Sequence, residues 1–579
     1  MTVPVLTRSY DNARSGVNAR ESVLTAAAVG SKGIRRLFSL QMQGDARGIE
    51  AQPLIVPDVT MADGTVHDVV CLASMANQVW AFDANDGTLL WERTLGVPIV
   101  GTTAIDGWLI NDHWGVLSTP VIDPAAGALY LVAWISPDGS VGKAQHVLHA
   151  VGLADGRALH PPLNLEGATY DPGHGRPVQQ FRSAARKQRA SLLLAAGTVF
   201  VAFGSVQETS ASSRGWIIAC DTAGWRITAS WAAAAAGYGA GIWQGGAGLA
   251  ADADGHIYAM TGNGTFDAVT DWAESFLKLR YTPPAGNAPG TLSVIDWWTP
   301  WTDDGRVGLD PSGVELNKPL PTNVRVYTQD VDAGWDDMDL GSGGPVLVAS
   351  LGMVVGAGKD GILYAVDLAA MGQTKPADLE QPAANYAKLR FPPAFFTYYP
   401  GTQLSPEPQD ISTLNLLFAD RTHHQHATPL FWDSPDHGPM LFCWGENGNL
   451  RAWSLQAAGI TYLACSAEVA SAQAAVPPGG MPGAMMCLGA NGTQKQSGVV
   501  WACIPYLDAN RVVSPGRLLA YDATQFASFA DGSKQLRVLW DSQAWGLTFS
   551  FNKFNPPVVA GGKLYVPTYD GRVDVYGLA

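Results

Sequence analysis

The sequence predicts an all-β protein, a single eight-bladed β-propeller made of four-stranded antiparallel blades. Three observations lead to this prediction: the composition, a recurring hairpin pattern, and a second recurring run that precedes each hairpin. The chain has 579 residues, of which 47% are hydrophobic and 15% charged, and it contains 64 glycines and 20 tryptophans. Few charges with many glycines and aromatic residues are typical of strands joined by tight turns.

The hairpin pattern recurs eight times. Its clearest copy is VWAFDANDGTLLWERTL at 79–95, where alternating apolar residues run into an Asp/Gly turn and a short strand carrying Trp follows. This arrangement is a sequence signal for a β-hairpin. The other copies lie at 146–160, 215–231, 275–298, 361–372, 448–463, 516–525 and 571–579.

A run of small and apolar residues precedes each hairpin and predicts an inner strand, because Gly, Ala and Pro suit the crowded centre of a propeller. Eight inner strands and eight outer hairpins predict eight blades, an arrangement that protects the sheet edges. The last blade shows only three strands, so we expect residues 36–42 to supply the fourth and close the ring. The inner runs lie at 51–56, 117–123, 189–195, 245–251, 342–348, 426–432, 482–488 and 555–560.

The repeats extend over the whole chain, so residues 1–579 are predicted to form one domain with an N-terminal extension at 1–35. Long loops at 300–340 and 374–423 join outer strands to the next inner strand. Such loops lie on one face of a propeller and are expected to cap its axial mouth. Long structured loops on a rigid scaffold are where binding sites usually lie.

Several stretches resemble a known family. AFDANDGTLLWE (81–92) and GKDGILYAVD (358–367) resemble repeats of quinoprotein alcohol dehydrogenase-like propellers, and other stretches resemble a group of bacterial PQQ-like repeat proteins. This resemblance implies pyrroloquinoline quinone (PQQ) on the propeller axis, beside a calcium or lanthanide ion held by Glu, Asn and Asp, with an Asp as base. The sequence has neither the adjacent cysteine pair of many of these enzymes nor a CxxCH haem motif.

A metal site is predicted where the sixth inner strand begins, in RTHHQHATPL at 421–430. His424 and His426 are two apart in a predicted strand, so their imidazoles share a face. With Asp339 one blade back, they would offer two nitrogens and a carboxylate to Ca²⁺, Zn²⁺ or Mn²⁺. The alternative interpretation is that these histidines only hydrogen-bond backbone at the strand entry.

The other inner-strand starts supply further candidates at the mouth. Arg189 and Lys553 are cations that could bind a substrate anion or stabilise developing negative charge, unless they form structural salt bridges. His113 is a candidate general base or third metal ligand, or else a solvated loop histidine. Trp243 and Gln244 are the candidate cofactor-binding residues.

These candidates favour an enzyme that uses a metal for hydrolysis or elimination on a small or oligomeric polar substrate. A PQQ-dependent alcohol or sugar dehydrogenase is the alternative that the resemblance implies. A second alternative is a non-catalytic scaffold or ligand-binding protein.

Composition also excludes some partners. The net charge is −15 and no basic patch occurs, so nucleic acid is not expected as a partner. No apolar stretch is long enough to span a bilayer. The first residues lack a signal-peptide core, so localisation stays open between cytoplasm and, if a leader is removed, periplasm or outside. The six cysteines show no CxxC spacing and are interpreted as small core residues, and we expect a monomer.

Overall fold

The computed structural model of the protein describes residues 3–45, 47–208, 210–300, 339–380, 382–390, 424–456, 459–474, 480–528 and 534–579, with short strands at 308–309, 315–316 and 394–395. The predicted loops at 300–340 and 374–423 therefore lie largely outside the described residues. His423, which the sequence places beside the predicted metal ligands, also lies outside them.

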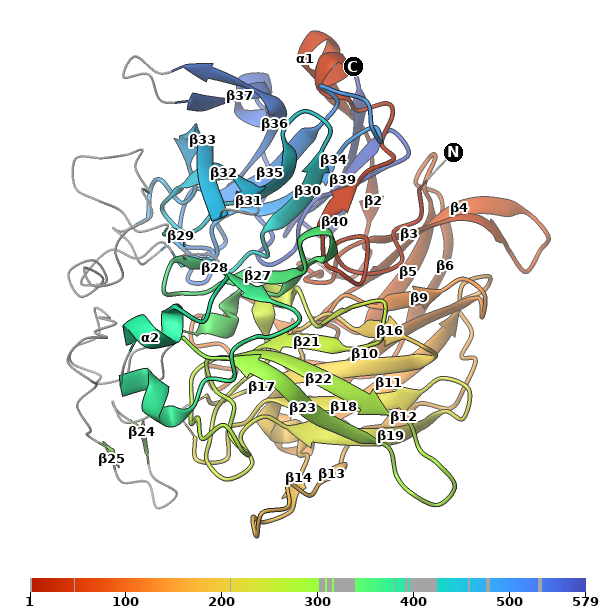
Figure 1. Ribbon diagram of the computed structural model, residues 1–579. Helices are drawn as coiled ribbons and strands as arrows, with labels where there is room; N and C mark the ends of the chain where they lie inside the picture. The colour runs from red at the N-terminus through yellow and green to blue at the C-terminus, as the bar shows by residue number, and fades with distance from the viewer. Residues whose placement is uncertain are drawn as a thin grey trace.

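Strands dominate the fold, and consecutive sets of four strands form antiparallel sheets (Figure 1). In each set the strands follow one another in chain order, as the hairpin repeats predict. The first sets are β3 (Leu54–Thr60), β4 (Val66–Ala73), β5 (Gln78–Asp83) and β6 (Leu89–Thr94); β9 (Val121–Asp123), β10 (Ala128–Ile135), β11 (Gln145–Gly152) and β12 (Leu163–Asn164); β16 (Leu193–Ala195), β17 (Thr198–Ser205), β18 (Trp216–Asp221) and β19 (Arg226–Ala232); and β20 (Ala250–Ala251), β21 (Ile257–Met260), β22 (Phe276–Thr282) and β23 (Thr291–Trp298).

The second half of the chain continues the pattern. Its sets are β26 (Val346–Val348), β27 (Met353–Ala357), β28 (Ile362–Asp367) and β29 (Ala394–Phe395); β30 (Leu430–Ser434), β31 (Gly438–Cys443), β32 (Asn449–Gln456) and β33 (Gly459–Val469); β34 (Met485–Gly489), β35 (Val499–Pro505), β36 (Gly516–Ser528) and β37 (Lys534–Asp541); and β38 (Val558–Ala560), β39 (Lys563–Pro567) and β40 (Arg572–Leu578) with β2 (Ile34–Gln41). One parallel pair, Cys465 with Gln535, joins β33 to β37 and merges two of these sets into one larger sheet.

A few short elements complete the described chain. They are β1 (Val17–Asn18), the hairpins β7 (Ile99–Val100) with β8 (His113–Trp114), β13 (Thr169–Tyr170) with β14 (Gln179–Gln180) and β24 (Gly308–Leu309) with β25 (Glu315–Leu316), the strand β15 (Arg186–Lys187) beside β17, and the helices α1 (Ala26–Lys32) and α2 (Pro382–Tyr386). Neither helix is long and apolar enough to cross a membrane, and no other helix in the described residues is.

The hydrophobic cores lie between neighbouring sheets, which explains why strands such as β10 and β17 are apolar and buried along almost their whole length. One core joins the β9–β12 sheet to the β16–β19 sheet, and others join each following pair in chain order. A further core contains residues of β38–β40, β3–β6 and β9–β12 together, so the last sheet packs on the first. Sheets packed face to face in a closed sequence form the radial arrangement of a β-propeller.

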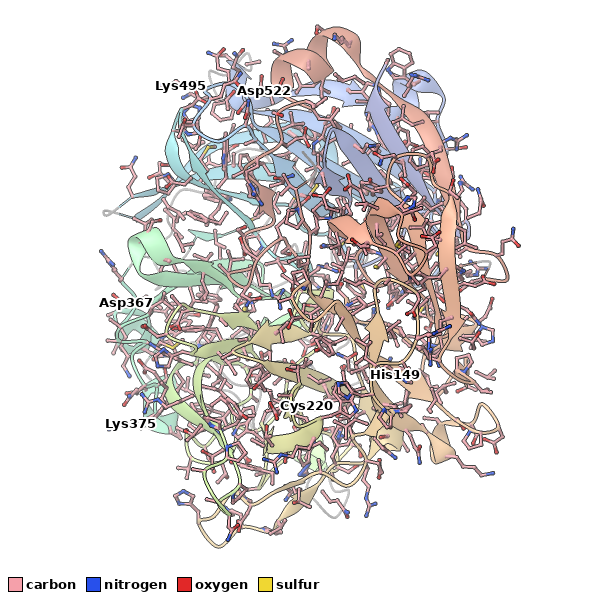
Figure 2. The ribbon with its side chains drawn as sticks, turned by 90° about the vertical axis from the view of Figure 1, so that its right-hand side faces the viewer. His149, Cys220, Asp367, Lys375, Lys495 and Asp522 are labelled. Carbon is pink, nitrogen blue, oxygen red and sulfur yellow. The ribbon has the colours of Figure 1, made fainter. Side chains whose placement is uncertain are left out.

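The predicted pairing of the N-terminal strand with the C-terminal strands is confirmed. β2 runs antiparallel to β40, from Ile34 opposite Leu578 to Gln41 opposite Arg572. The interpretation of the cysteines as core residues is also supported, since all six are buried and none forms a disulfide. Figure 2 shows Cys220 among the strands, whereas the exposed Lys375 and Lys495 lie at the periphery.

The N-terminal segment from Val5 to Gly16 lies at the centre of the molecule, where the first strands of the sheets meet. Its main chain accepts hydrogen bonds from successive first strands in chain order, and Val5 exchanges a pair of hydrogen bonds with Ile55 of β3. The side chains of Asn12 and Tyr10 reach the two first strands that the main chain does not bond. The partners on the first strands are Ile55 (β3), Ile122 (β9), Leu194 (β16), Ala251 (β20), Leu347 (β26), Phe431 (β30), Leu488 (β34) and Val559 (β38).

Arg14 is the most highly connected side chain of this segment, and it is completely buried. Its Nε donates to the carbonyl of Leu249 at 2.8 Å and its Nη2 to that of Leu192 at 3.0 Å, which ties two neighbouring sheets together. Its Nη1 donates to the Thr7 hydroxyl and to the Arg8 carbonyl. Burial lowers the pKa of Arg14 to about 10, still well above neutrality.

Replacing Arg14 by Leu is expected to lower the free energy of unfolding by about 3–5 kcal/mol, because several buried acceptors would lose their donor. Urea denaturation followed by tryptophan fluorescence measures this loss as a lower midpoint. Arg20, whose side chain is exposed, supplies the control: Arg20→Leu should stay within about 0.5 kcal/mol of the parent. Equal midpoints for both variants would contradict a structural role for Arg14.

Candidate active site

A cavity of about 280 Å³ lies where the segments that lead into the first strands meet. Its wall carries four aromatic side chains, those of Trp108, Trp114, Trp243 and Phe554. Four cations also line it, namely Lys187, Arg189, Lys359 and Lys553, together with the carboxylates of Asp106 and Glu208. The cavity is therefore both aromatic and rich in positive charge.

Three of the sequence-predicted site residues meet at this cavity. Arg189 precedes β16, Trp243 precedes β20 and Lys553 precedes β38, so they come from distant parts of the chain. They converge because the first strands of all the sheets point toward the same centre. The prediction that inner-strand starts gather around one mouth is supported for these three residues.

Arg189 is held by a buried carboxylate, that of Glu50, to which its Nη1 donates. Glu50 also accepts hydrogen bonds from the Tyr569 hydroxyl at 2.7 Å and from the Asn111 side-chain amide at 3.0 Å. Burial tends to raise the pKa of Glu50, but the charges of Arg189 and Lys553 and these hydrogen bonds lower it below its usual value. Glu50 is therefore an anion that fixes Arg189 against the cavity.

Aromatic faces support the cations of the wall. The Arg189 guanidinium lies 4.7 Å from the centre of the Phe554 ring, and the Lys187 ammonium lies 4.5 Å from that of the Trp114 indole. Both distances fall in the range of cation–π attraction. The rings thus orient the positive groups while leaving their other sides available to a ligand.

Lys187 and Lys553 have only neutral hydrogen-bond partners. The Lys187 ammonium donates to the carbonyl of Ile105 at 2.8 Å, and the Lys553 ammonium donates to the Asn510 side-chain oxygen at 2.9 Å. In the described part of the chain, neither ammonium has a carboxylate within ion-pair distance. Two ammonium groups in this setting give the cavity a local positive charge.

The pKa values of both lysines reflect this crowding. Burial, then the neighbouring Arg189 charge, lowers the pKa of Lys187 to about 8, and burial likewise lowers that of Lys553. Nearby carboxylates, Glu50 for Lys553 and Glu208 for Lys187, oppose this lowering without forming an ion pair with either lysine in the described residues, and a bound anion would offset more of the cost of burial. Ligand binding and the protonation of Lys187 are therefore coupled.

Trp243 and Gln244 are adjacent in sequence but have different surroundings. Trp243 lines the cavity, and its buried indole Nε1 has no hydrogen-bond partner among the described residues. Gln244 is completely buried, and its amide faces backbone groups of Met260 rather than the cavity. Of the two predicted cofactor-binding residues, only Trp243 is placed to touch a ligand.

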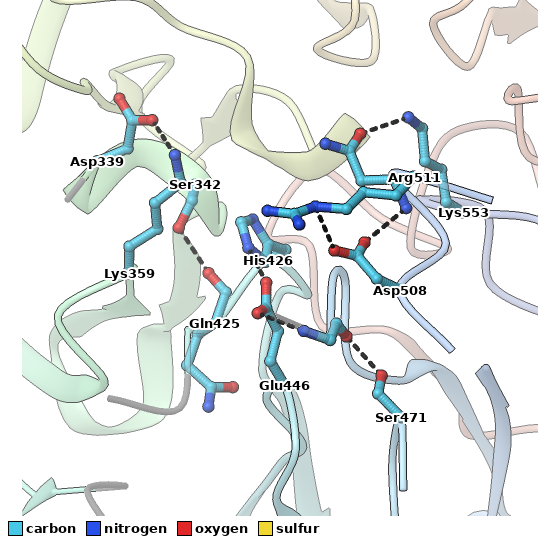
Figure 3. A network of polar contacts seen from close by, with 12 residues as sticks. Asp339, Ser342, Lys359, Gln425, His426, Glu446, Ser471, Asp508, Arg511 and Lys553 are labelled. Atoms are coloured by element: carbon cyan, nitrogen blue, oxygen red, sulfur yellow. Dashed lines mark hydrogen bonds and ion pairs between the residues drawn. The ribbon is translucent and has the colours of Figure 1, made fainter. Parts of the chain in front are cut away.

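The predicted metal ligands do not gather as a set. His424 and His426 lie with Glu446, and the nearest ligand atoms of these three side chains are within 4.8 Å of one another. Asp339 is engaged elsewhere: it pairs with the Lys359 ammonium at 2.8 Å and accepts the backbone N–H of Asn263. Figure 3 shows His426 facing Glu446, whereas Asp339 is bound to Lys359 at the left of the view.

Glu446 was not predicted from the sequence, although a register argument would have found it. Leu430 of β30 pairs with Phe442 of β31, and continuing this antiparallel register beyond the strands brings Glu446 opposite His426. His426 Nε2 lies 2.6 Å from a carboxylate oxygen of Glu446. Burial tends to raise the pKa of Glu446, but this hydrogen bond and the charges of the two histidines lower it to about 2.

His113 lies on the surface. It belongs to the short strand β8, in which His113 is exposed and the next residue, Trp114, is buried and lines the cavity. Adjacent residues of a strand point to opposite sides, so the side that faces the cavity is taken by the indole. His113 is not among the residues that line the cavity.

An aromatic polyanion such as trimesate is expected to bind this cavity, with an affinity that falls as the pH rises through about 8. Lys187 is charged below that pH and neutral above it, so its attraction for the anion is lost on the alkaline side. Isothermal titration calorimetry between pH 7 and pH 9 measures the change.

The variant Lys187→Met should bind trimesate more weakly at pH 7 and lose the part of the pH dependence centred near 8. The matched variant Lys143→Met, at an exposed lysine paired with Asp138, should behave as the parent. A Lys187→Met profile that still falls near pH 8 would count against this assignment.

No protein-family model and no curated protein matches the sequence. Solved structures do match in fold. A quinohemoprotein alcohol dehydrogenase from Comamonas testosteroni aligns with 100% of this chain and 81% of its own, with a TM-score of 0.53 and 14% identity. A quinohemoprotein alcohol dehydrogenase from Pseudomonas putida aligns with 99% of this chain and 80% of its own, with a TM-score of 0.50 and 14% identity. The chain therefore has the fold of the quinoprotein alcohol dehydrogenases, as its sequence resemblance predicted.

Proposed function

We propose that this protein is an eight-bladed β-propeller whose axial cavity binds a planar anionic quinone, pyrroloquinoline quinone, and uses it to oxidise an alcohol. The observation that carries the proposal is the pair of ammonium groups, Lys187 and Lys553, that line the cavity and whose hydrogen-bond partners within the described residues are neutral. The fold shared with quinohemoprotein alcohol dehydrogenases supports the same choice.

The strand sets support the proposed count of eight blades. Each of the eight inner runs of the sequence contributes to a set of four strands, if the merged sheet is divided at its single parallel pair between Cys465 and Gln535. The final set takes its fourth strand from β2. Eight sets packed in a closed sequence match the number of repeats in the chain.

The residues of the cavity fit the proposed cofactor. Pyrroloquinoline quinone is a flat aromatic molecule with three carboxylates, and the wall offers flat rings together with Lys187, Arg189 and Lys553 for the negative groups. Trp243 supplies an indole face and a buried N–H without a partner. A cavity of about 280 Å³ lies just below the ~300–1,000 Å³ typical of small-molecule sites.

The lining of this cavity supports the metal ion that the resemblance implies less well than it supports the quinone. Among the described residues, no group of three His, Cys, Asp or Glu side chains suited to an ion is formed by residues that line it. Asp106 and Glu208 are its lining carboxylates. The proposal therefore assigns no step of the alcohol oxidation to a metal ion.

Bound pyrroloquinoline quinone would supply a two-electron acceptor for the oxidation of an alcohol. The side chains of the protein would bind and orient: Lys187 and Lys553 hold carboxylates, and Trp243 stacks on the flat ring. Asp106 is the group we assign to accept the hydroxyl proton of the alcohol. Its two carboxylate oxygens each accept a backbone N–H, from Trp108 and Ile110, which fixes the carboxylate at the cavity wall.

The other two predicted functions have less support. Metal-dependent hydrolysis or elimination would need an ion near the cavity, whereas the His424, His426 and Glu446 group lies outside its lining. A non-catalytic scaffold would not require charged groups and aromatic rings to converge on one pocket. The shared fold favours the dehydrogenase over both.

Pyrroloquinoline quinone added to the purified protein should quench its tryptophan fluorescence and saturate with a single site. Trp243→Ala should weaken binding by about tenfold, because it removes a stacking face worth about 0.5–1.5 kcal/mol beyond area burial. The control Trp545→Ala changes an exposed indole that does not line the cavity and should leave the affinity unchanged. No saturable binding by the parent protein would overturn the proposal.

Asp106→Asn should retain cofactor binding and lose alcohol-dependent dye reduction by more than about 100-fold, in line with the contribution of a general base. The assay uses protein loaded with pyrroloquinoline quinone, a redox dye and a series of primary alcohols. Equal turnover in parent and variant would reject Asp106 as the proton acceptor, while binding without turnover in both would leave the cavity as a binding site only.

A further inference from the structure

We propose that His424, His426 and Glu446 form a separate binding site for a divalent transition-metal ion of the Zn²⁺ class. None of the three residues lines the cavity, so this site does not rest on the proposed dehydrogenase function. Glu446, which the fold brings opposite the histidines, takes the ligand role that the sequence predicted for Asp339. Asp339 is paired with Lys359 instead.

The three ligand atoms are already close to a common centre. They lie within 4.8 Å of one another, and two ligands of one zinc ion with bonds of about 2.0–2.2 Å lie roughly 3–4 Å apart. Small side-chain rotations therefore suffice to bring all three onto one ion. Figure 3 shows the His426 ring and the Glu446 carboxylate pointing toward one another.

Backbone hydrogen bonds hold these ligands in place. The Glu446 N–H donates to the His424 carbonyl at 3.0 Å, and the Gln425 N–H between the histidines donates to the Gly358 carbonyl at 3.0 Å. The second carboxylate oxygen of Glu446 accepts the N–H of Gly480 at 3.2 Å. A metal site needs ligands that are fixed in this way by their surroundings.

The hydrogen bond to Glu446 accounts for only one of the two ring nitrogens of His426. The ring is completely buried, and its Nδ1 has no hydrogen-bond partner among the described residues. A buried polar nitrogen without a partner is costly, whichever tautomer the ring adopts. An ion bound through Nε2 would leave this nitrogen as it is, so the proposal rests on the three ligand atoms grouped within 4.8 Å of one another.

The chemistry of the donors selects the class of ion. Two imidazole nitrogens and one carboxylate suit Zn²⁺, Co²⁺ or Fe²⁺, whereas Ca²⁺ prefers six to eight oxygens. The rings of Trp243 and Phe554 lie 5.7 and 6.2 Å from that of His426, so aromatic groups flank one part of the site. Both rings also line the cavity, and an ion here would be sensed by Trp243.

A second cluster in the described residues provides a contrast. Asp252, Asp254 and His256 also lie close together, in the turn between β20 and β21. Here Asp252 is already satisfied: it accepts hydrogen bonds from the Tyr258 hydroxyl and from the backbone of both other residues, and Asp254 is exposed. This cluster is a hydrogen-bonded turn and serves as the control.

The experiment uses the full chain, stripped with a chelator and then titrated with Co²⁺ and Zn²⁺ in the absence of any quinone. The parent should bind one equivalent of Co²⁺, with visible d–d absorption bands and quenching of tryptophan fluorescence, and Zn²⁺ should displace it. His424→Ala should weaken binding by more than about 100-fold, since loss of outer partners alone costs about 10–100-fold. Glu446→Gln should do the same.

His424 is only partly buried, so His424→Ala is expected to fold even if changes at the buried His426 or Glu446 do not. Circular dichroism verifies this before titration. The matched control His256→Ala should bind as the parent does. The proposal is overturned if the parent binds no ion, if His424→Ala binds it equally well, or if binding is lost in His256→Ala instead.

Discussion

The N-terminal segment that passes through the centre is the interaction on which the rest of the structure depends. The first strand of every sheet would otherwise present unpaired backbone groups toward the axis, and such edges are costly when buried. The segment satisfies them by bonding to the first strands in chain order, from Ile55 of β3 to Leu488 of β34. The buried guanidinium of Arg14 then connects this segment to two sheets at once.

The same convergence creates the cavity. Because first strands meet at the centre, the residues that lead into them meet there too, and several of these are cationic or aromatic. Arg8 links the two features, since it belongs to the central segment and donates to the carbonyl of Phe554, whose ring lines the cavity. Close backbone packing is part of this arrangement: Gly245, with φ of 52°, has no room for a Cβ against the carbonyl of His426.

Charge compensation divides the central cations into two groups. Glu50 and Asp339 neutralise Arg189 and Lys359, which makes these two pairs part of the framework. Lys187 and Lys553 receive only neutral acceptors, so an anionic ligand is the partner that would complete them. The proposed function thus rests on the two ammonium groups that lack an ion pair in the described residues, and the paired cations hold the wall in shape.

The sequence by itself determined the strand sets, the closure of β2 on β40, and the meeting of Arg189, Trp243 and Lys553, because hairpin alternation and turn residues are local signals that repeat. It did not determine which acid faces the histidines: hairpin register brings in Glu446, and an ion pair with Lys359 removes Asp339. It also could not show that His113 lies on the surface and Trp114 at the cavity, since the residues alternate sides in a strand of only two residues. The path of the N-terminal segment was likewise decided only by tertiary structure, because an irregular stretch has no periodicity and its hydrogen bonds to the first strands join residues far apart in the chain.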